Sequence, residues 1–235
     1  MEPERYHMQG KLIVFEGVEG CGKTTQIQRS YTWLLHSPLF AALQANEVVN
    51  QLVVTREPGG TALGQTVRQW LLNPTVQSPL HDRAELLLFA ADRAQHVEEL
   101  LKPQLASGGL ILCDRYTDST VAYQGYGRRL NLDLIDQLNQ VATNGLESDL
   151  TIWLDLDVAV GLNRTKRRGA ADRMEAIDLS FHQRVQHGFT ELARAHPHRI
   201  VRVDASLSEA EVSQQIQSIL EQWLTRWYPP LSLTS

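Results

Sequence analysis

The sequence has no apolar run near the roughly 20 residues that a membrane-spanning helix requires. Its start, MEPERYHMQG, lacks the apolar stretch of a secretory signal peptide. Cysteine is scarce: Cys21 and Cys113 lie far apart, without a CxxC or Cys/His spacing, which excludes a disulfide framework and gives no zinc-site pattern. We expect a soluble, cytoplasmic protein that has no membrane partner.

An excess of positive charge is also missing, because the formal net charge is −5. A nonspecific nucleic-acid binder usually has a strongly basic face, so no nucleic-acid partner is expected and any anionic ligand must be small and held locally. With 235 residues, 43% of them hydrophobic, the chain can bury one sizeable core. We expect a single domain over residues 11–228, an N-terminal extension at 1–10 and a proline-bearing tail at 229–235.

Short aliphatic runs without polar alternation recur along the chain, at residues 12–15, 52–54, 110–113, 150–154 and 200–203. Such runs are typical of strands covered on both faces. Helices are predicted between and after them, at residues 23–35, 62–72, 83–101, 132–142, 159–168, 179–195 and 208–227. The pattern predicts an α/β fold with a doubly wound, five-stranded parallel sheet flanked by helices in three layers. The connection at 36–51, interrupted by Pro38, is expected to be irregular or a short extra helix.

The stretch GVEGCGKT, residues 17–24, fits the spacing GxxxxGK[ST] between a buried strand and a helix. Gly17, Gly20 and Gly22 let the backbone turn and aim its N–H groups at an anion, and the following helix adds its positive dipole end. A glycine-rich turn that only caps a helix is the alternative. The pattern favours a phosphate-binding loop (P-loop), in which Lys23 reaches the β and γ phosphates and the Thr24 hydroxyl ligates Mg²⁺.

On this interpretation ATP is bound by Gly17, Val18, Glu19, Gly20, Cys21, Gly22, Lys23, Thr24 and Thr25. The third strand ends as LILCDRY, which places Asp114 and Arg115 at the carboxyl end of the sheet, where ligands bind in open α/β folds. Asp114 would hold the water shell of Mg²⁺, and Arg115 would grip a phosphate. A guanine-specific switch protein is disfavoured, because the sequence has no NKxD tetrapeptide.

Phe89 and Arg93 lie four apart within LLLFAADR and therefore share one helix face. An aromatic plane and a guanidinium on one face suit a flat base: Phe89 would stack on it, and Arg93 would donate to its carbonyl oxygens. Such donors suit thymine O4 but meet the amino group of cytosine unfavourably, because buried donors would be left unpaired. Core packing of Phe89 and an exposed ion pair of Arg93 are the alternatives.

Four motifs in this order, TREPGGT (55–61), FxxxR (89–93), DRY (114–116) and AYQG (122–125), resemble the bacterial-type thymidylate kinases. The resemblance covers most of the chain and implies transfer of the ATP γ phosphate to dTMP. It implies acceptor contacts from Glu57, Pro58, Arg68, Phe89, Arg93, Arg115, Thr120, Tyr123 and Gln124. It also implies a homodimer, with the apolar helix around residues 86–101 as a candidate interface.

The resemblance also assigns individual roles. Arg68 and Arg115 would contact the phosphate of the acceptor, and Thr120 and Gln124 would approach its base. Tyr123 would crowd the 2′ position of the sugar. From its place beside the phosphates, Glu57 would orient the acceptor or its sugar hydroxyl.

Positive charge is concentrated in RTKRRGAADRME, residues 164–175, which Gly169 and two alanines interrupt. Charge develops on the oxygens of a transferring phosphoryl group, and arginines that close over it accelerate the transfer. Because the centre of the P-loop has no arginine, we expect a small mobile lid that supplies this cation from Arg164, Arg168 or Arg173. A solvated basic helix end is the alternative.

The sequence therefore predicts a nucleoside monophosphate kinase that uses Mg·ATP to phosphorylate dTMP in dTTP biosynthesis. The predicted catalytic residues are Lys23, Glu57, Arg115 and the three lid arginines, and Thr24 and Asp114 are the predicted metal-binding pair. Two alternatives stay open: a kinase of another pyrimidine nucleotide or deoxynucleoside, and a P-loop switch protein that binds ATP or GTP.

Overall fold

The computed structural model describes residues 10–73, 80–167 and 172–229 of the chain. Five strands form one parallel sheet in the order β2-β3-β1-β4-β5. Their bounds are β1 Lys11–Glu16, β2 Leu52–Arg56, β3 Leu110–Asp114, β4 Leu150–Asp155 and β5 Ile200–Asp204. The predicted five-stranded parallel sheet is confirmed.

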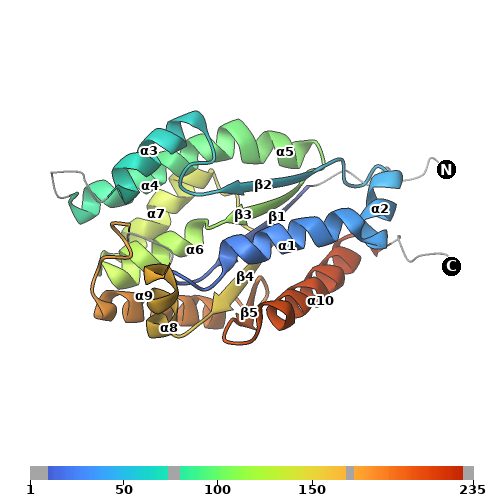
Figure 1. The fold of residues 1–235 in the computed structure, drawn as a ribbon. Helices are drawn as coiled ribbons and strands as arrows, with labels where there is room; N and C mark the ends of the chain where they lie inside the picture. Colours follow the sequence, from blue (N-terminus) through green and yellow to red (C-terminus); the bar gives the residue numbers. More distant parts are fainter. Residues whose placement is uncertain (1–9, 74–79, 168–171, 230–235) are drawn as a thin grey trace.

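Helices connect the strands and cover the sheet on both faces (Figure 1). They are α1 Lys23–His36, α2 Pro38–Ala45, α3 Ala62–Leu72, α4 Asp82–His96, η1 Val97–Leu101, α5 Lys102–Ala106, α6 Thr117–Thr120, η2 Val121–Gly127, α7 Leu132–Thr143, α8 Val158–Lys166, α9 Leu179–Ala195 and α10 Glu209–Trp227. The strand order runs outward from β1 in two directions, which makes this the predicted doubly wound α/β fold. Within the described ranges, none of these helices has the length and apolarity to cross a membrane.

Side chains of the central strand β1 alternate between two hydrophobic cores, one on each face of the sheet. Ile13 and Phe15 belong to a core that includes side chains of α1 and α10. Leu12 and Val14 belong to a second core, which includes side chains of η1. Since both faces are covered, every position of the strand interior is apolar, and this explains why the sequence shows runs rather than alternation.

Several segments differ in detail from the sequence-based expectation. The stretch predicted as one helix at 83–101 consists of α4 and the π-helical turn η1, and α5 extends it to Ala106. The connection at 36–51 contains α2, the short extra helix named as one of two possibilities. Its cap is Ser37, whose Oγ accepts from the Phe40 N–H at 3.3 Å, and Pro38 occupies the first turn. Pro38 therefore starts a helix, a position that suits its fixed φ and missing N–H.

The carboxyl ends of β1 and β3 lie side by side at the centre of the sheet, where Phe15 pairs with Asp114. Ligands bind at such a point in open α/β sheets, because the loops that follow neighbouring strands diverge to opposite faces. The P-loop follows β1 and the DRY segment follows β3, so the fold places both motifs at one opening.

Candidate active site

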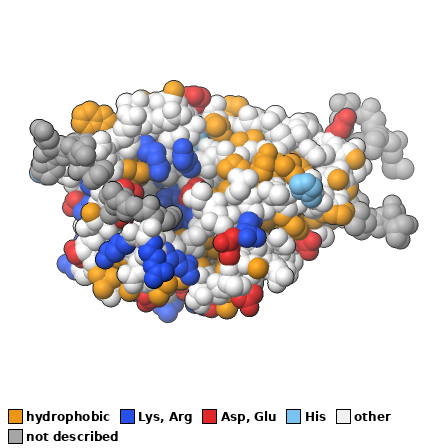
Figure 2. Space-filling model, viewed as in Figure 1, with side chains coloured by type: hydrophobic (Ala, Val, Ile, Leu, Met, Phe, Trp, Pro, Cys, Tyr) orange, Lys and Arg blue, Asp and Glu red, His pale blue; other side chains and the backbone are white. Residues whose placement is uncertain are grey.

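A cavity of about 250 Å³ lies at the carboxyl ends of the strands. Figure 2 shows Lys and Arg side chains gathered on both sides of a hollow in this face of the molecule. All nine residues predicted to contact the acceptor line the cavity, as does Asp114. Six residues of the predicted ATP-binding segment also line it: Glu19, Gly20, Gly22, Lys23, Thr24 and Thr25. The two predicted binding sets therefore share one space.

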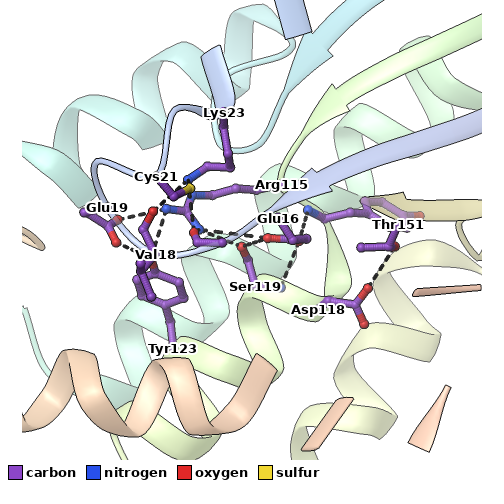
Figure 3. A network of polar contacts seen from close by, with 12 residues as sticks. Glu16, Val18, Glu19, Cys21, Lys23, Arg115, Asp118, Ser119, Tyr123 and Thr151 are labelled. Carbon is purple, nitrogen blue, oxygen red and sulfur yellow. Dashed lines mark hydrogen bonds and ion pairs between the residues drawn. The ribbon is translucent and has the colours of Figure 1, made fainter. Parts of the chain in front are cut away.

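The P-loop turns through three glycines of positive φ, since Gly17, Gly20 and Gly22 have φ values of 143°, 71° and 98°. A Cβ atom on Gly20 would lie 2.1 Å from the carbonyl oxygen of Gly161 in α8, so a side chain is excluded there by space as well as by conformation. Lys23 begins α1, and its buried ammonium donates to the Gly17 carbonyl oxygen at 3.0 Å (Figure 3). The loop thus has the shape and the cation of a phosphate cradle.

Arg115 connects the P-loop to the segment after β3 (Figure 3). Its Nη2 donates to Glu19 Oε1 and to the Tyr123 hydroxyl, both at 2.9 Å, and its Nη1 donates to Ser119 Oγ at 3.0 Å. The Tyr123 hydroxyl in turn donates to Glu19. Burial opposes ionisation of Glu19, but the charges of Arg115 and Lys23 lower the pKa of this carboxyl. One carboxylate thus joins the predicted ATP-binding and acceptor-binding residues.

Glu16, the last residue of β1, is a buried supporting residue that the sequence analysis missed; it does not line the cavity. Its Oε1 accepts from the backbone N–H groups of Tyr116 and Ser119 at 2.9 and 3.1 Å, and its Oε2 accepts from Ser119 Oγ at 2.6 Å (Figure 3). Burial raises the pKa of Glu16 to about 7, although the charge of Arg115 opposes the shift. The only sequence signal was an acidic residue that continues a buried apolar run.

The predicted metal-binding pair, Thr24 and Asp114, lines the cavity. Asp114 Oδ1 is buried and has no hydrogen-bond partner among the described residues. An unpaired carboxylate oxygen and a hydroxyl are hard oxygen donors, which suit Mg²⁺ held together with water and phosphate oxygens. No group of three or more His, Cys, Asp or Glu side chains able to hold a metal occurs in the described part of the chain. The residues therefore fit a metal that arrives with a nucleotide.

Arg93 lines the cavity but is 2% exposed, and protein acceptors hold most of its guanidinium. Its Nε donates to Glu57 Oε2 at 2.8 Å, and its Nη1 donates to Thr120 Oγ1 at 2.9 Å and to Asn139 Oδ1 at 2.7 Å. Its Nη2 donates to the Tyr116 carbonyl oxygen at 3.0 Å. Because a guanidinium has five N–H groups, these four bonds leave one on Nη2. Asn139, in α7, had no sequence signal.

Glu57 uses both carboxylate oxygens within the protein. Besides the bond from Arg93, its Oε1 lies 2.9 Å from His96 Nδ1, and His96 Nε2 lies 2.7 Å from Thr55 Oγ1. The following peptide bond, Glu57–Pro58, is cis. Glu57, which directly follows β2, therefore supports Arg93 and lines the cavity at the same time. The buried His96 is a further supporting residue that the sequence analysis missed.

Three arginines surround the space beside the P-loop. Arg56, Arg68 and Arg115 line the cavity, and Arg68 Nη1 donates to the Pro58 carbonyl oxygen at 2.9 Å. Burial and then the charge of Arg56 lower the pKa of Arg68. The positive charges of these arginines repel one another, and a bound anion would relieve that repulsion. The three side chains therefore form a suitable site for an anion.

The segment at 164–175 is only partly described. Arg164, in α8, is exposed and does not line the cavity, and Arg168 lies outside the described residues. Arg173 does not line the cavity either: its Nε donates to the Leu71 carbonyl oxygen at 2.7 Å, and its Nη2 donates to Glu85. The nearby Asp172, Met174 and Glu175 do line it. In the described part of this segment, Asp172, Met174 and Glu175 therefore reach the cavity, whereas Arg164 and Arg173 do not.

Comparisons with known proteins identify the family of the chain. The thymidylate kinase family model matches residues 15–216. The chain is 60% identical over 233 residues to a thymidylate kinase of Cyanothece sp. (strain PCC 7425 / ATCC 29141), covering 96% of this chain and 100% of that one. It is 59% identical to a thymidylate kinase of Nostoc punctiforme (strain ATCC 29133 / PCC 73102), covering 91% and 96% of the two chains. The crystal structure of thymidylate kinase from Ehrlichia chaffeensis matches with a TM-score of 0.69 at 32% identity, over 91% of this chain and 99% of that one. The chain belongs to the thymidylate kinase family.

Proposed function

We propose that this protein transfers the γ phosphate of ATP to dTMP and releases dTDP and ADP. The observation that carries the proposal is that residues of the P-loop and all nine predicted acceptor residues line one and the same cavity. Membership of the thymidylate kinase family agrees with this arrangement. No described contact favours another acceptor or a switch function.

The donor half of the reaction falls to the P-loop. Its backbone N–H groups and the start of α1 would hold the phosphates, and the Lys23 ammonium would leave the Gly17 carbonyl oxygen to follow the γ phosphate. The Thr24 hydroxyl would ligate Mg²⁺, Asp114 would hold its water shell, and the metal would neutralise charge on the phosphate oxygens. No covalent protein intermediate is needed, because positioning and charge neutralisation supply the acceleration.

The acceptor phosphate would lie among Arg56, Arg68 and Arg115. Arg115 bridges the two halves, because it also contacts Glu19 of the P-loop. An arginine shared in this way would place the attacking oxygen of the acceptor near the donor phosphate. We propose that Arg115 and Lys23 stabilise the charge of the transferring group from within the cavity.

Two side chains that line the cavity can form hydrogen bonds with thymine. The N–H left on Arg93 Nη2 suits the acceptor O4, and the carbonyl of Gln124 suits the N3–H donor, while Phe89 supplies the stacking plane. Cytosine has an amino group in place of O4 and an unprotonated N3, so both protein groups would face a group of the same kind. Buried groups left unpaired make this mismatch costly.

The lid arginines remain part of the proposal. Arg164 and Arg168 would close over the transferring phosphate, and Arg173 would take part only after it leaves Glu85. Glu57 is proposed to act through Arg93 rather than by holding the sugar, because both of its oxygens are engaged. Tyr123 would limit space at the 2′ position. We also propose Mg²⁺ dependence, a homodimer and a cytoplasmic location.

The proposal is tested by measuring ATP-dependent phosphorylation of a panel containing dTMP, dUMP, dCMP, CMP and UMP. We expect dTMP to have the highest kcat/KM. Lys23→Met should abolish transfer to every acceptor, which controls for contaminating kinases. Turnover of CMP equal to or faster than that of dTMP would defeat the proposal, as would ATP hydrolysis without a phosphorylated acceptor.

A further inference from the structure

Glu85, in the first turn of α4, is a fully buried carboxylate that does not line the cavity. Its Oε1 accepts from Gln124 Nε2 at 2.9 Å and from Arg128 Nε at 3.3 Å. Its Oε2 accepts from Arg128 Nη2 at 3.1 Å and from Arg173 Nη2. A buried carboxylate is costly unless it is fully paired, and here its partners include Gln124 of the acceptor site and Arg173 of the proposed lid.

The charge of Glu85 determines which way the Gln124 amide points. Burial would raise the pKa of Glu85, but the hydrogen bond and charge of Arg128 hold the pKa below its ordinary value. An ionised carboxylate only accepts hydrogen bonds, so it must meet the NH₂ end of the amide. Gln124 is 1% exposed and lines the cavity, and no described donor lies on its Oε1. The carbonyl end is therefore the end left for a ligand.

We propose that Glu85 is the positioning residue for base selectivity: by accepting from Gln124 Nε2, it presents the Gln124 carbonyl to a base that carries an N3–H. This inference rests on the proposed function, and it extends it by assigning the discrimination against cytosine to a residue that does not touch the substrate. A glutamine amide can present either end to a ligand, and the two ends select opposite bases. Glu85 removes that ambiguity.

The Glu85 carboxylate also connects the base-binding residue Gln124 to Arg173 of the proposed lid. Arg173 shares Glu85 Oε2 with Arg128, so release of Arg173 would leave Arg128 to keep the carboxylate paired and ionised. The orientation of Gln124 should therefore survive when Arg173 is removed. Removal of Arg173 therefore distinguishes the proposed role of Glu85 in orienting Gln124 from a role in holding the lid.

The test measures kcat/KM for dTMP and for dCMP in wild type, Glu85→Gln, Gln124→Leu and the double variant. We expect Glu85→Gln to lower the ratio of dTMP to dCMP about tenfold or more, because its amide lets Gln124 flip. The rise in the KM for dTMP should exceed any change in the KM for ATP. The double variant should lose no more selectivity than Gln124→Leu alone, because both changes remove the same oriented carbonyl. If the loss of selectivity in the double variant equals the product of the losses in the two single variants, the two residues act independently and the proposal is overturned.

Arg173→Ala is the matched control, because it removes one partner of Glu85 and leaves the bond to Gln124. We expect the ratio of dTMP to dCMP to stay at the wild-type value, even where kcat falls. A ratio that falls as far as in Glu85→Gln would assign the effect to the lid-side contact and overturn the proposal. A wild type that does not prefer dTMP defeats the proposed function itself, whereas a preference that Glu85→Gln leaves intact defeats only this inference.

A measurement on the wild type stands apart from the folding of any variant. In the ligand-free protein, Gln124 Nε2 donates one of its two protons to a buried carboxylate, so NMR should show slow exchange of that proton with solvent. Addition of dTMP should leave that exchange slow. Rapid exchange before the ligand is added would place the NH₂ end in the cavity and contradict the proposal.

Discussion

At the scale of single residues, the carboxyl group of Glu16 determines the shape of the loop that carries Arg115. Arg115 has a φ of 71°, a left-handed conformation that costs a side-chain-bearing residue about 1–3 kcal/mol. The next N–H group, that of Tyr116, and both donors of Ser119 bind Glu16 and hold the turn. A strained backbone is thereby kept in the one conformation that brings the Arg115 guanidinium to the P-loop.

The raised pKa of Glu16 predicts a particular dependence of stability on pH. The folded-state pKa of about 7 exceeds the ordinary value of 4.5, so the folded protein binds this proton more tightly than the unfolded chain. The associated stability is fully present below pH 4.5 and is lost as the pH rises through 7, by about 3 kcal/mol in all. Glu16→Gln, which does not titrate, should lack this loss when unfolding by urea is measured from pH 4.5 to 8.

Glu221→Gln provides the control, since it makes the same chemical change at an exposed position of α10. Its unfolding free energy should follow the wild-type pH dependence throughout. If Glu16→Gln also follows the wild-type curve, Glu16 is not titrating in this window and the burial argument is wrong.

At the scale of elements, the P-loop and α8 meet through their backbones. A Cβ atom on Gly20 would lie 2.1 Å from the Gly161 carbonyl oxygen, and one on Gly161 would lie 2.2 Å from the Glu19 carbonyl oxygen. Two glycines therefore allow the ATP-binding loop to touch the helix that carries Arg164. Since α8 carries the start of the proposed lid, this contact would hold that end of the lid beside the P-loop.

Gly20→Ala should therefore damage ATP binding more than fold stability alone explains. The added methyl group both collides with α8 and disfavours the left-handed turn, so the loop must move away from its phosphate-binding shape. We expect the KM for ATP to rise roughly tenfold or more, a change equivalent to about 1.4 kcal/mol. Steady-state kinetics at saturating dTMP would measure it.

Gly145→Ala is a close control, because Gly145 has a φ of 77° but no atom within 4 Å of the added Cβ. It should cost about 1–2 kcal/mol of stability through backbone strain and leave the KM for ATP unchanged. Equal effects of the two substitutions on ATP would mean that contact with α8 does not shape the P-loop.

At the scale of the whole molecule, α4 packs against α3 and α7, and all three helices carry exposed apolar side chains. They include Trp70, Leu87 and Val141, which are 59%, 56% and 80% exposed. The helix around residues 86–101 was the predicted dimer interface, but Val97 and Leu101 in its second half lie in the core. If a homodimer forms as proposed, the first half of α4 and its neighbours offer the surface for it.

Leu87→Asp should weaken such a dimer, because an unpaired carboxylate would be buried between the subunits. We expect the dissociation constant to rise by roughly a hundredfold or more, equivalent to about 2.8 kcal/mol. Sedimentation velocity over a range of protein concentrations would measure it. Leu35→Asp, an exposed apolar position on α1, should leave the association unchanged. A wild type that remains monomeric at high micromolar concentration would contradict the homodimer.

The elements that could be predicted from the sequence are those with local signals. The strands were recognisable because burial on both faces demands continuous apolar runs, and the P-loop because its turn demands glycines at fixed positions. Phe89 and Arg93 could be paired from their helical spacing, and they do line one cavity. The π-helical turn η1 could not be foreseen, because its residues are ordinary helix formers and tertiary packing decides the extra residue in the turn.

The sequence alone determined the order of the elements, the place of the phosphate-binding loop and the family to which the motifs belong, because these depend on residues near one another in the chain. The tertiary structure decided which side chains hold the binding groups. Glu16 reaches Ser119 across 103 positions, Glu85 reaches Arg173 across 88, and Arg93 reaches Asn139 across 46. Such contacts follow from strand order and helix packing, and no local spacing encodes them.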